Sequence, residues 1–306
     1  MVVRTLIAVC CAVLTCGWIC AQNPPAGSAE AARAETQRSQ DDDMIYRETR
    51  RGKTNLPNSD LSPSFNKETL ERIKEFRKVE PQAATKYSEF TKSPDAGITK
   101  ILPNNGCQSA RVVDASERCR NFIPQSYAFS FRTKGYVSEP YGDITFYDAR
   151  IFTGGFFAQS AIVSLGNVPI ETIDLTNPGV KLLSAIPPDR DFDAAKATAQ
   201  RLKQGYSSDG MSVNTVGRTA LNTTYVIRVI AYRSGASVPP LSDKSTTMEK
   251  WFLSLDNDTR GDILAVFRIV DAKPDGAMTI VWKLLERADA PKLKFGKGEP
   301  LGDFRQ

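Results

Sequence analysis

The chain has 306 residues, of which 41% are hydrophobic and 25% charged, and its formal net charge is +5. This length suits one ordinary domain or two small ones, and so mild a positive surplus does not indicate a nucleic-acid partner. Histidine is absent, which excludes the usual serine, cysteine and zinc hydrolase mechanisms, because each of them needs an imidazole to move a proton or hold a metal.

Residues 1–21 have the pattern of a secretory signal peptide. Arg4 gives a positively charged start, an apolar run extends from Leu6 to Trp18, and Ala21 provides a small residue at the end. The run is shorter than the roughly 20 residues that span a bilayer, so we expect cleavage after Ala21 and not a membrane anchor. The mature chain is then expected to be soluble, without a transmembrane segment, and secreted or located in the periplasm or cell envelope.

Residues 22–64 are rich in Pro, Ser, Ala, Gln and charge, and we expect a disordered spacer there. An amphipathic helical arm is predicted over residues 65–92, because Asn66 is a good N-cap and Pro81 ends or kinks a first helix and starts a second. The apolar residues expected to face inward are Leu70, Ile73, Phe76, Val79, Ala84, Tyr87 and Phe90. This arm packs either on the domain itself or on a partner.

Cysteine usage indicates one disulfide. Four of the six cysteines lie in the predicted leader, and only Cys107 and Cys119 remain. An even pair in an exported chain favours a structural disulfide, which would stabilise the fold by roughly 3 kcal/mol in the chain-entropy model. A redox or metal pair is the alternative, but the two-residue spacing and further ligands are missing. We expect no metal and no cofactor. The surrounding stretch 94–124 shows no periodicity and is expected to be a loop.

A β-rich globular domain is predicted over residues 93–290. After the loop at 94–124, the elements expected in its first half are strands. They are a half-buried strand at Ser126–Thr133, a hairpin of Asp143–Phe152 and Phe156–Leu165 turning at 153–155, and a shorter pair, Val168–Leu175 and Val180–Ile186, turning at 176–179.

The second half of this domain combines helices and strands. A helix is predicted from Phe192 to Gly205, a loop over 206–212 and a strand over Thr223–Tyr232. Thr246 and Glu249 have the spacing of a capping box, which predicts a short helix that lies on the sheet.

The clearest signal is a hairpin over residues 261–287 that turns at Lys273–Gly276. If partner numbers sum to 550, Arg268 lies opposite Trp282 and Phe267 opposite Lys283. Both faces are apolar, so this hairpin is expected in the middle of a layered domain. Residues 291–306 are expected to form an irregular tail. The fold class that follows is α+β, mainly antiparallel, either sandwich-like or a strongly bent sheet with two or three helices packed on it.

Without histidine, the remaining catalytic routes are a carboxylate pair, a Ser–Lys dyad or a lysine nucleophile. Candidate carboxylates are Asp143, Asp148 and Asp174, and Asp148 is expected to share a strand face with Arg150 as its ion-pair partner. No spacing in this chain fixes the distance between carboxylates, on which a glycosidase mechanism depends. An ordinary ion pair on a strand face, or a residue at the rim of the core, is the favoured explanation of these carboxylates.

The candidate ligand contacts are Tyr136, Tyr141 and Asp148, because two aromatic residues in a turn-rich loop can stack on a sugar or a protein partner. Basic residues within apolar strands, namely Arg228, Arg268 and Lys283, are expected at the edge of the core, with Arg268 over the Trp282 ring. The alternative for these three residues is a basic groove for anions.

The sequence favours an exported, soluble, β-rich binding or structural module of the periplasm or cell envelope, with a protein or glycan partner and without a nucleic-acid partner. The alternative is a carboxylate-dependent glycan-acting enzyme or a glycan-binding protein. A third possibility is a component of a larger envelope assembly, which would dock through the arm at 65–92.

Overall fold

The computed structural model describes residues 66–306, with gaps at 110–111, 236–244, 256–257, 298 and 305–306. The predicted leader at 1–21 and the predicted spacer at 22–64 lie outside the described residues. Among the described helices, none is both long and apolar enough to cross a membrane.

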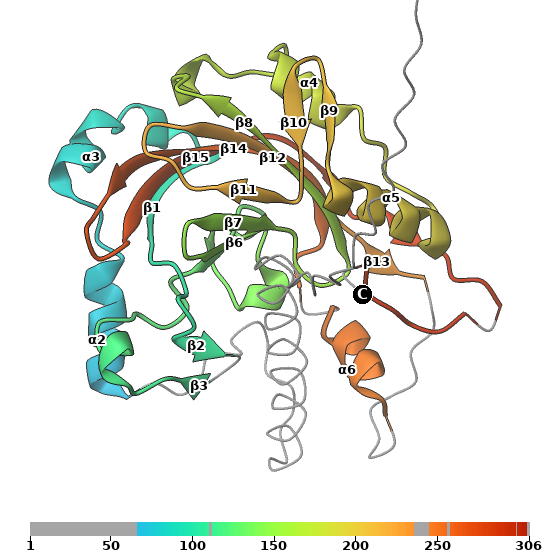
Figure 1. Cartoon of the computed structure of the whole chain (residues 1–306), viewed down its shortest axis with the longest axis horizontal. Coiled ribbons are helices and arrows are strands. Elements are labelled where there is room, and N and C mark those ends of the chain that lie inside the picture. Colours follow the sequence, from blue (N-terminus) through green and yellow to red (C-terminus); the bar gives the residue numbers. More distant parts are fainter. Residues whose placement is uncertain (1–65, 110–111, 236–244, 256–257, 298, 305–306) are drawn as a thin grey trace, which may run out of the picture. The chain divides into compact units, whose positions relative to one another are not determined.

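Two five-stranded antiparallel sheets form the body of the domain (Figure 1). The large sheet has the longer strands, in the order β1 (Ala96–Ile101), β15 (Met278–Asp289), β14 (Gly261–Ala272), β12 (Thr224–Ala231) and β8 (Ala158–Gly166). The small sheet has the order β11 (Val216–Arg218), β7 (Arg150–Thr153), β6 (Ile144–Tyr147), β4 (Ala128–Ser130) and β5 (Gly135–Tyr136). With the helices described below, this confirms the predicted α+β class with mainly antiparallel strands.

The two sheets pack face to face around the main core. Alternate residues of both sheets point into it, including Phe129, Ile144 and Phe146 from the small sheet and Tyr225 and Phe267 from the large sheet. Rings from opposite sheets meet directly, since the centroids of Phe146 and Phe267 are 6.4 Å apart. The domain is therefore sandwich-like, which is one of the two arrangements that the sequence predicted.

The final hairpin, β14–β15, is buried on both faces as predicted, but its predicted register is wrong. Ala272 does pair with Met278, whereas a bulge at Val270 shifts the following pairs by one residue. Phe267 therefore lies opposite Trp282, and Arg268 lies opposite Val281. A one-residue slip exchanges the two faces of a strand, so Trp282 points into the main core with Phe267.

Strand β1 was missed because its residues alternate weakly and lie in the stretch predicted to be a loop. It pairs with β15 over Ala96–Ile101. Gly97 lies opposite Trp282, and a side chain at Gly97 would collide with the indole ring, whose Cζ2 atom would be 2.5 Å away. The Trp282 Nε1 atom is buried without a hydrogen-bond partner among the described residues.

A helical layer covers the other face of the large sheet (Figure 1). It contains α4 (Pro178–Ser184), α5 (Phe192–Gln204), the turn Ile170–Thr172 and the small hairpin of β9 (Tyr206–Ser208) and β10 (Met211–Val213). Asp191 caps helix α5, its side chain accepting a hydrogen bond from Ala194 N, and the helix ends at Gly205 with φ +74°, the stop that the sequence predicted. The predicted loop at 206–212 is the β9–β10 hairpin instead.

The predicted strand pair at 168–175 and 180–186 is wrong. Asn177 caps α4 by accepting a hydrogen bond from Gly179 N, and Pro178 occupies the first helical position. Proline at that position suits a helix as well as a turn, and the buried Val180 and Leu183 fit a helical stripe. The other part of the segment is a 3₁₀ turn, Ile170–Thr172.

The predicted hairpin across 153–155 is also wrong. Strand β7 turns back onto β6 at Asp148 and pairs with it, while β8 belongs to the large sheet. The turn at 153–157 therefore carries the chain from one sheet to the other. Gly155 is required there, because a Cβ atom would lie 2.1 Å from the carbonyl oxygen of Pro140. The strand predicted at Ser126–Thr133 is shortened to β4 and is buried on both faces, not on one.

The arm packs on the domain itself. Its helices are α2 (Lys67–Phe76), which Asn66 caps as predicted, and α3 (Pro81–Lys86). Ile73 and Tyr87 are buried, but Leu70 is 51% exposed and Ala84 is exposed, so the predicted inward stripe is only partly correct. Two cation–π contacts join the arm to the large sheet. Lys100 Nζ lies 5.1 Å from the centroid of the Phe76 ring, and Lys283 Nζ lies 6.0 Å from the centroid of the Phe90 ring.

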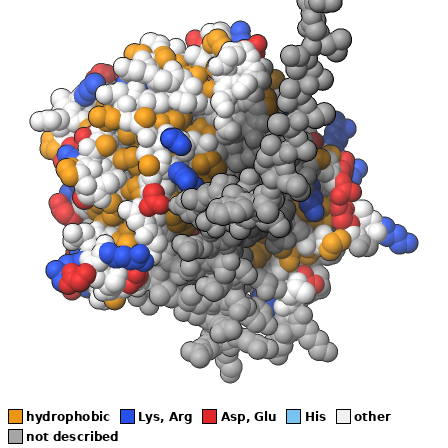
Figure 2. Space-filling view, viewed as in Figure 1, with side chains coloured by type: hydrophobic (Ala, Val, Ile, Leu, Met, Phe, Trp, Pro, Cys, Tyr) orange, Lys and Arg blue, Asp and Glu red, His pale blue; other side chains and the backbone are white. Residues whose placement is uncertain are grey.

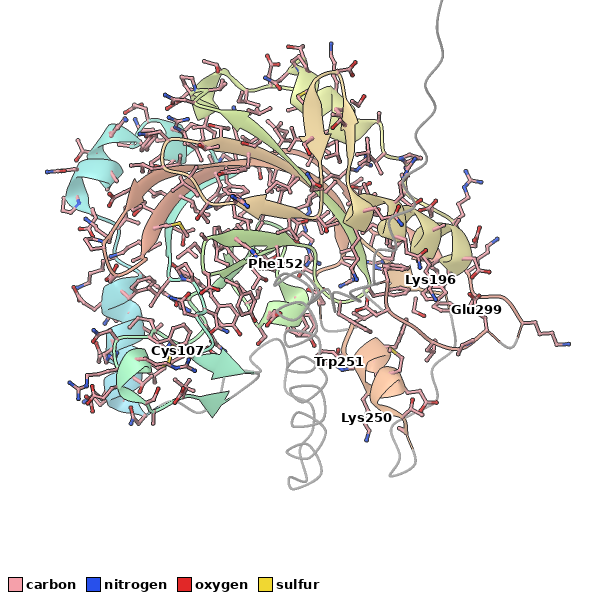
Figure 3. The ribbon with its side chains drawn as sticks, in the orientation of Figure 1. Cys107, Phe152, Lys196, Lys250, Trp251 and Glu299 are labelled. Atoms are coloured by element: carbon pink, nitrogen blue, oxygen red, sulfur yellow. A yellow bond between two sulfur atoms is a disulfide. The ribbon has the colours of Figure 1, made fainter. Side chains whose placement is uncertain are left out.

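Cys107 and Cys119 form the predicted disulfide, with Cα atoms 5.4 Å apart. It closes a segment that contains β2 (Gln108–Ser109), β3 (Val112–Val113) and the turn Glu117–Cys119. Figure 3 shows Cys107 between α2 and the β2–β3 hairpin. The bridge is part of a small apolar cluster with Ile73, Phe122 and Tyr127.

Another apolar cluster contains residues of the C-terminal segment. Helix α6 (Thr247–Ser254) begins with the predicted capping box of Thr246 and Glu249. Strand β16 (Lys292–Leu293) pairs with β13 (Arg233–Ser234), and Phe304 stacks on Phe157 with centroids 4.9 Å apart. The residues of 291–306 that the structure describes are thus largely without regular structure, but they pack into the domain.

Candidate functional site

Tyr136, one of the predicted ligand contacts, is a packing residue. Its hydroxyl donates to the Lys100 carbonyl (2.6 Å) and accepts from Thr99 Oγ1 (2.8 Å). The Arg77 guanidinium lies over the ring, 4.2 Å from its centroid. Burial raises the pKa of Tyr136. A ring with one face covered and its hydroxyl already bonded has little left to offer a ligand.

Tyr141 and Asp148 lie on different elements from Tyr136, which is part of β5. Tyr141 is half-buried at the end of a 3₁₀ turn, Glu139–Tyr141. Asp148 is exposed in the β6–β7 turn with φ +48°, a conformation that aspartate tolerates better than most residues. The expectation that Asp148 and Arg150 share a strand face is wrong, because the turn separates them, and no ion pair joins these two described residues.

Asp143 and Asp174, the other two predicted carboxylates, lie in unlike surroundings. Asp143 is fully buried in the small sheet. Asp174 is exposed in the helical layer, where the hydroxyl and backbone N–H of Thr176 donate to it and lower its pKa. Asp148 occupies a third position, so no two of these three carboxylates form a pair that could divide acid and base roles.

Asp143 belongs to a buried ionic network that the sequence did not predict. Arg132 Nε donates to Asp143 (2.6 Å), and Arg132 Nη1 donates to Asp258 (3.1 Å). Further N–H groups of Arg132 donate to the carbonyls of Thr259 (2.8 Å) and Tyr141 (2.8 Å). Burial acts to lower the pKa of Arg132, but the two carboxylates outweigh it and raise the pKa above its ordinary value.

Arg260 completes the network. It donates to Asp258 (2.7 Å) and to the carbonyls of Tyr232 (2.9 Å), Phe156 (3.0 Å) and Phe157 (2.5 Å). Burial lowers the pKa of Arg260 to about 10, so the side chain remains charged at neutral pH. The two arginines and the two aspartates balance each other in charge, and the guanidinium N–H groups donate to acceptors within the protein. The network therefore fixes the loops between the sheets and leaves no group for a substrate.

The basic residues predicted at the core edge also contact groups of the protein itself. Arg268 does not lie over Trp282, because of the register shift, and donates instead to Val168 O (2.9 Å) and Asn167 Oδ1 (2.6 Å). Burial lowers the pKa of Lys283, which lies near Phe90.

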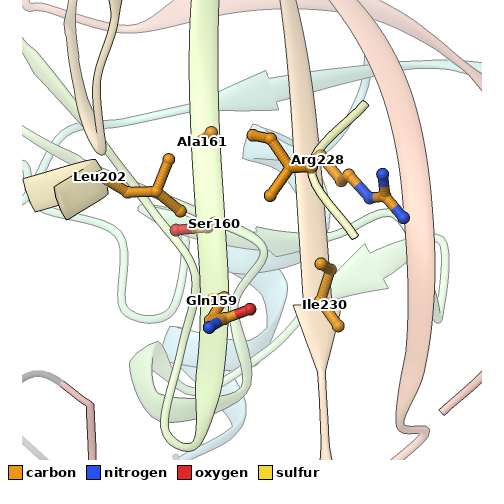
Figure 4. A pocket seen from close by; sticks show the side chains of 7 residues that line it. Gln159, Ser160, Ala161, Leu202, Arg228 and Ile230 are labelled. Atoms are coloured by element: carbon orange, nitrogen blue, oxygen red, sulfur yellow. The ribbon is translucent and has the colours of Figure 1, made fainter. Parts of the chain in front are cut away.

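Arg228 forms a two-point ion pair with Asp262 (3.1 and 2.8 Å) and caps α4 by donating to the carbonyls of Leu183 and Ser184. A surface cleft of about 180 Å³ lies beside this pair, lined also by Glu286 and Arg287. Between β12 and β8, Leu202 and Ile230 line a narrow space that is too small for a water molecule. Figure 4 shows that the Arg228 guanidinium points away from this space. The cations do not form a groove.

The outer face of the small sheet carries a different arrangement. Arg150 on β7 and Arg218 on β11 are directly opposite each other, and both side chains are exposed. Neither guanidinium forms an ion pair, a hydrogen bond or a ring contact with another described residue. Figure 2 shows basic side chains close together over β7 and β11, with hydrophobic side chains around them and an acidic side chain beside them.

The hydrogen-bond pattern places these two arginines at the closest cross-strand approach. Thr219 N donates to Ala149 O (2.9 Å), immediately beyond the pair. Arg150 and Arg218 are therefore a non-hydrogen-bonded pair, in which Cα atoms lie only about 4.5 Å apart. Like charges directly opposite each other in a sheet are destabilising, so the fold itself gains nothing from this pair.

Apolar side chains occupy the next row of the same face. Phe152, two residues after Arg150, is opposite Val216, which is 38% exposed. Tyr147 packs edge-on against Phe152, with centroids 5.8 Å apart, and its hydroxyl donates to Glu139 (2.5 Å). Figure 3 labels Phe152 on β7. We call the surface formed by Tyr147, Arg150, Phe152, Val216 and Arg218 the arginine face.

The sequence predicted part of this face only. Arg150 and Phe152 were placed on a strand, whereas Val216 and Arg218 lie in a segment for which no element was predicted. Strand β11 has three residues, one of them Gly217, which is too short for alternation to be recognised. No signal in the sequence pairs residue 150 with residue 218.

Among the described residues, no group of three or more aspartate, glutamate or cysteine side chains could hold a metal ion. Comparison with known proteins adds no identity, since no family model, curated protein or solved structure matches the chain.

Proposed function

We propose that the chain is an exported binding module of the periplasm or cell envelope, and that it binds its partner through the arginine face. The single observation that carries this proposal is the pair Arg150 and Arg218, two exposed like charges at the closest cross-strand approach that form no ion pair with a described residue. An arrangement that costs stability is typical of a functional surface.

Supporting observations come from composition and from the state of the other polar groups. The apolar start of the chain and the disulfide suit an exported protein. The missing histidine removes the usual hydrolase mechanisms. The buried ionic groups that were described above are already paired, so they support the fold and not a reaction. The rival function, a carboxylate-dependent glycan-acting enzyme, has no pair of candidate carboxylates placed together among Asp143, Asp148 and Asp174.

Site-specific photo-crosslinking tests the binding surface. The full chain is expressed with its own leader, carries a photo-reactive phenylalanine analogue at Val216, and is incubated with an envelope extract of the source cells. We expect a discrete crosslinked partner and recovery of the chain in the exported fraction. The matched control carries the same analogue at Leu175, which is 47% exposed in the helical layer. Equal labelling from both positions, or none from 216, overturns the proposal.

A further inference from the structure

This inference deepens the proposed function and rests on it. We infer that the arginine face binds an extended acidic peptide segment of a protein partner, with one carboxylate held between Arg150 and Arg218 and an apolar side chain against Phe152 and Val216.

The charge of the ligand follows from the two guanidinium groups. Each guanidinium presents five N–H donors in a planar fork that matches a carboxylate. Arg150 and Arg218 lie side by side without an acceptor among the described residues. A carboxylate between them removes their mutual repulsion and forms charge-assisted hydrogen bonds to both. Binding an anion therefore relieves an unfavourable contact of the free protein.

The shape of the ligand follows from the spacing of the two rows. Arg150 and Phe152 are two residues apart on β7, so their rows are separated by about 6.7 Å. Same-face residues of an extended peptide repeat at the same distance. A peptide that lies along β7 can therefore place a carboxylate on the arginine row and an apolar side chain on the Phe152–Val216 row.

A peptide fits this face better than an acidic glycan does. Stacking on a sugar needs an accessible aromatic ring face, but the Phe152 side chain is half-buried and has Tyr147 at its edge. Val216, the exposed member of the apolar row, offers contact area without a ring. An aliphatic surface next to two guanidinium groups suits alternating acidic and apolar side chains.

Fluorescence anisotropy tests this inference with the full chain, purified after expression with its own leader. The probe is a labelled peptide in which glutamate alternates with valine, and its control has glutamine in place of glutamate. We expect salt-dependent binding of the glutamate peptide, at least about tenfold weaker binding of the glutamine peptide, and a similar loss for the variant Arg150→Gln/Arg218→Gln.

The matched control is Arg190→Gln/Arg233→Gln, which removes the same charge from two exposed arginines elsewhere on the surface and should change binding less than about twofold. Equal losses in both double variants, no binding of the glutamate peptide, or preferential binding of a polyuronate each overturn the inference. Crosslinking from position 216 in the experiment above is independent of the peptide, so failure here leaves the proposed function standing.

Discussion

Charged side chains occupy two contrasting settings in this protein. Arg132 and Asp143 are buried against each other and share their neighbours with a second pair, Asp258 and Arg260. Arg150 and Arg218, by contrast, face solvent with like charges opposed. Removing a partner from the buried network should therefore harm the fold, whereas removing charge from the arginine face should not.

We expect Asp143→Ala to destabilise the domain by about 3–5 kcal/mol, because Arg132 then remains buried with one carboxylate fewer. Equilibrium unfolding in urea measures the free energy. Asp174→Ala is the control, since Asp174 is exposed and bonded only within its own turn; its effect should be below about 1 kcal/mol. Similar losses from the two variants would show that the network is not a principal support of the fold.

Arg218→Glu should leave the domain as stable as before, or more stable by about 0.2–1 kcal/mol, since it converts an opposed like-charge pair into a cross-strand ion pair. The midpoint of urea unfolding at low and at high salt is the measurement, and the gain should shrink as salt increases. A clear loss of stability would mean that Arg218 supports the small sheet in a way that its described contacts do not reveal.

At the scale of single elements, the arm at 66–92 behaves as part of the domain. Ile73→Ala should cost about 2–5 kcal/mol, because the side chain is buried beside the disulfide. Leu70→Ala, on the exposed side of the same helix, is the matched control and should change stability by less than about 0.5 kcal/mol. If both variants unfold at the same urea concentration, α2 contributes nothing to the packed core.

The disulfide is the second element-scale support. Replacing both Cys107 and Cys119 by serine should lower the free energy of unfolding by about 3 kcal/mol, because a short loop is released in the unfolded chain. Thermal unfolding followed by far-ultraviolet circular dichroism provides the comparison. The expected loss should also appear when the unaltered chain is unfolded under reducing conditions, and an unchanged midpoint in both experiments would contradict it.

Elements with strong local signals could be predicted from the sequence. Gly205 marks the end of α5, Thr246 with Glu249 marks the start of α6, and Pro274 with Gly276 defines the last turn. Helix α4 could not be recognised, because Asn177–Pro178 starts a turn as readily as a helix.

Tertiary relations were harder to predict. The bulge at Val270 has no sequence signature, yet it decides which face of β15 enters the core. The candidate site depends on such a relation, since β11 pairs with β7 across more than sixty intervening residues. Arg150 could be named as a strand residue, but its neighbour Arg218 could not.

At the scale of the whole molecule, buried tyrosines make stability sensitive to alkaline pH. Burial, with the nearby Glu139 carboxylate, raises the pKa of Tyr147, and burial raises the pKa of Tyr232. The unfolded chain releases these protons near pH 10, so their contribution is fully present below that pH and is lost as the pH rises further. Each such tyrosine should lower stability by about 1.4 kcal/mol per pH unit above 10.

Urea unfolding between pH 8 and pH 11 measures this dependence. The comparison variant Tyr147→Phe removes one titrating hydroxyl, so its stability should fall less steeply with pH than that of the unaltered chain. Lysines titrate in the same range in both proteins and cancel in the difference. Parallel pH profiles would contradict a buried, neutral Tyr147.

The strand order of the large sheet also determines when the fold can be completed. Among the described strands, β1 pairs with β15 alone, and the two positions next to it in the sheet are taken by the last long strands of the chain, β15 and β14. During synthesis from the N-terminus, β1 and β12 emerge with an empty gap between them that only the closing hairpin can fill. The large sheet of the nascent chain therefore stays incomplete until almost the last residues have left the ribosome. A chain that ends before Met278 exposes an unpaired apolar strand edge, which promotes aggregation.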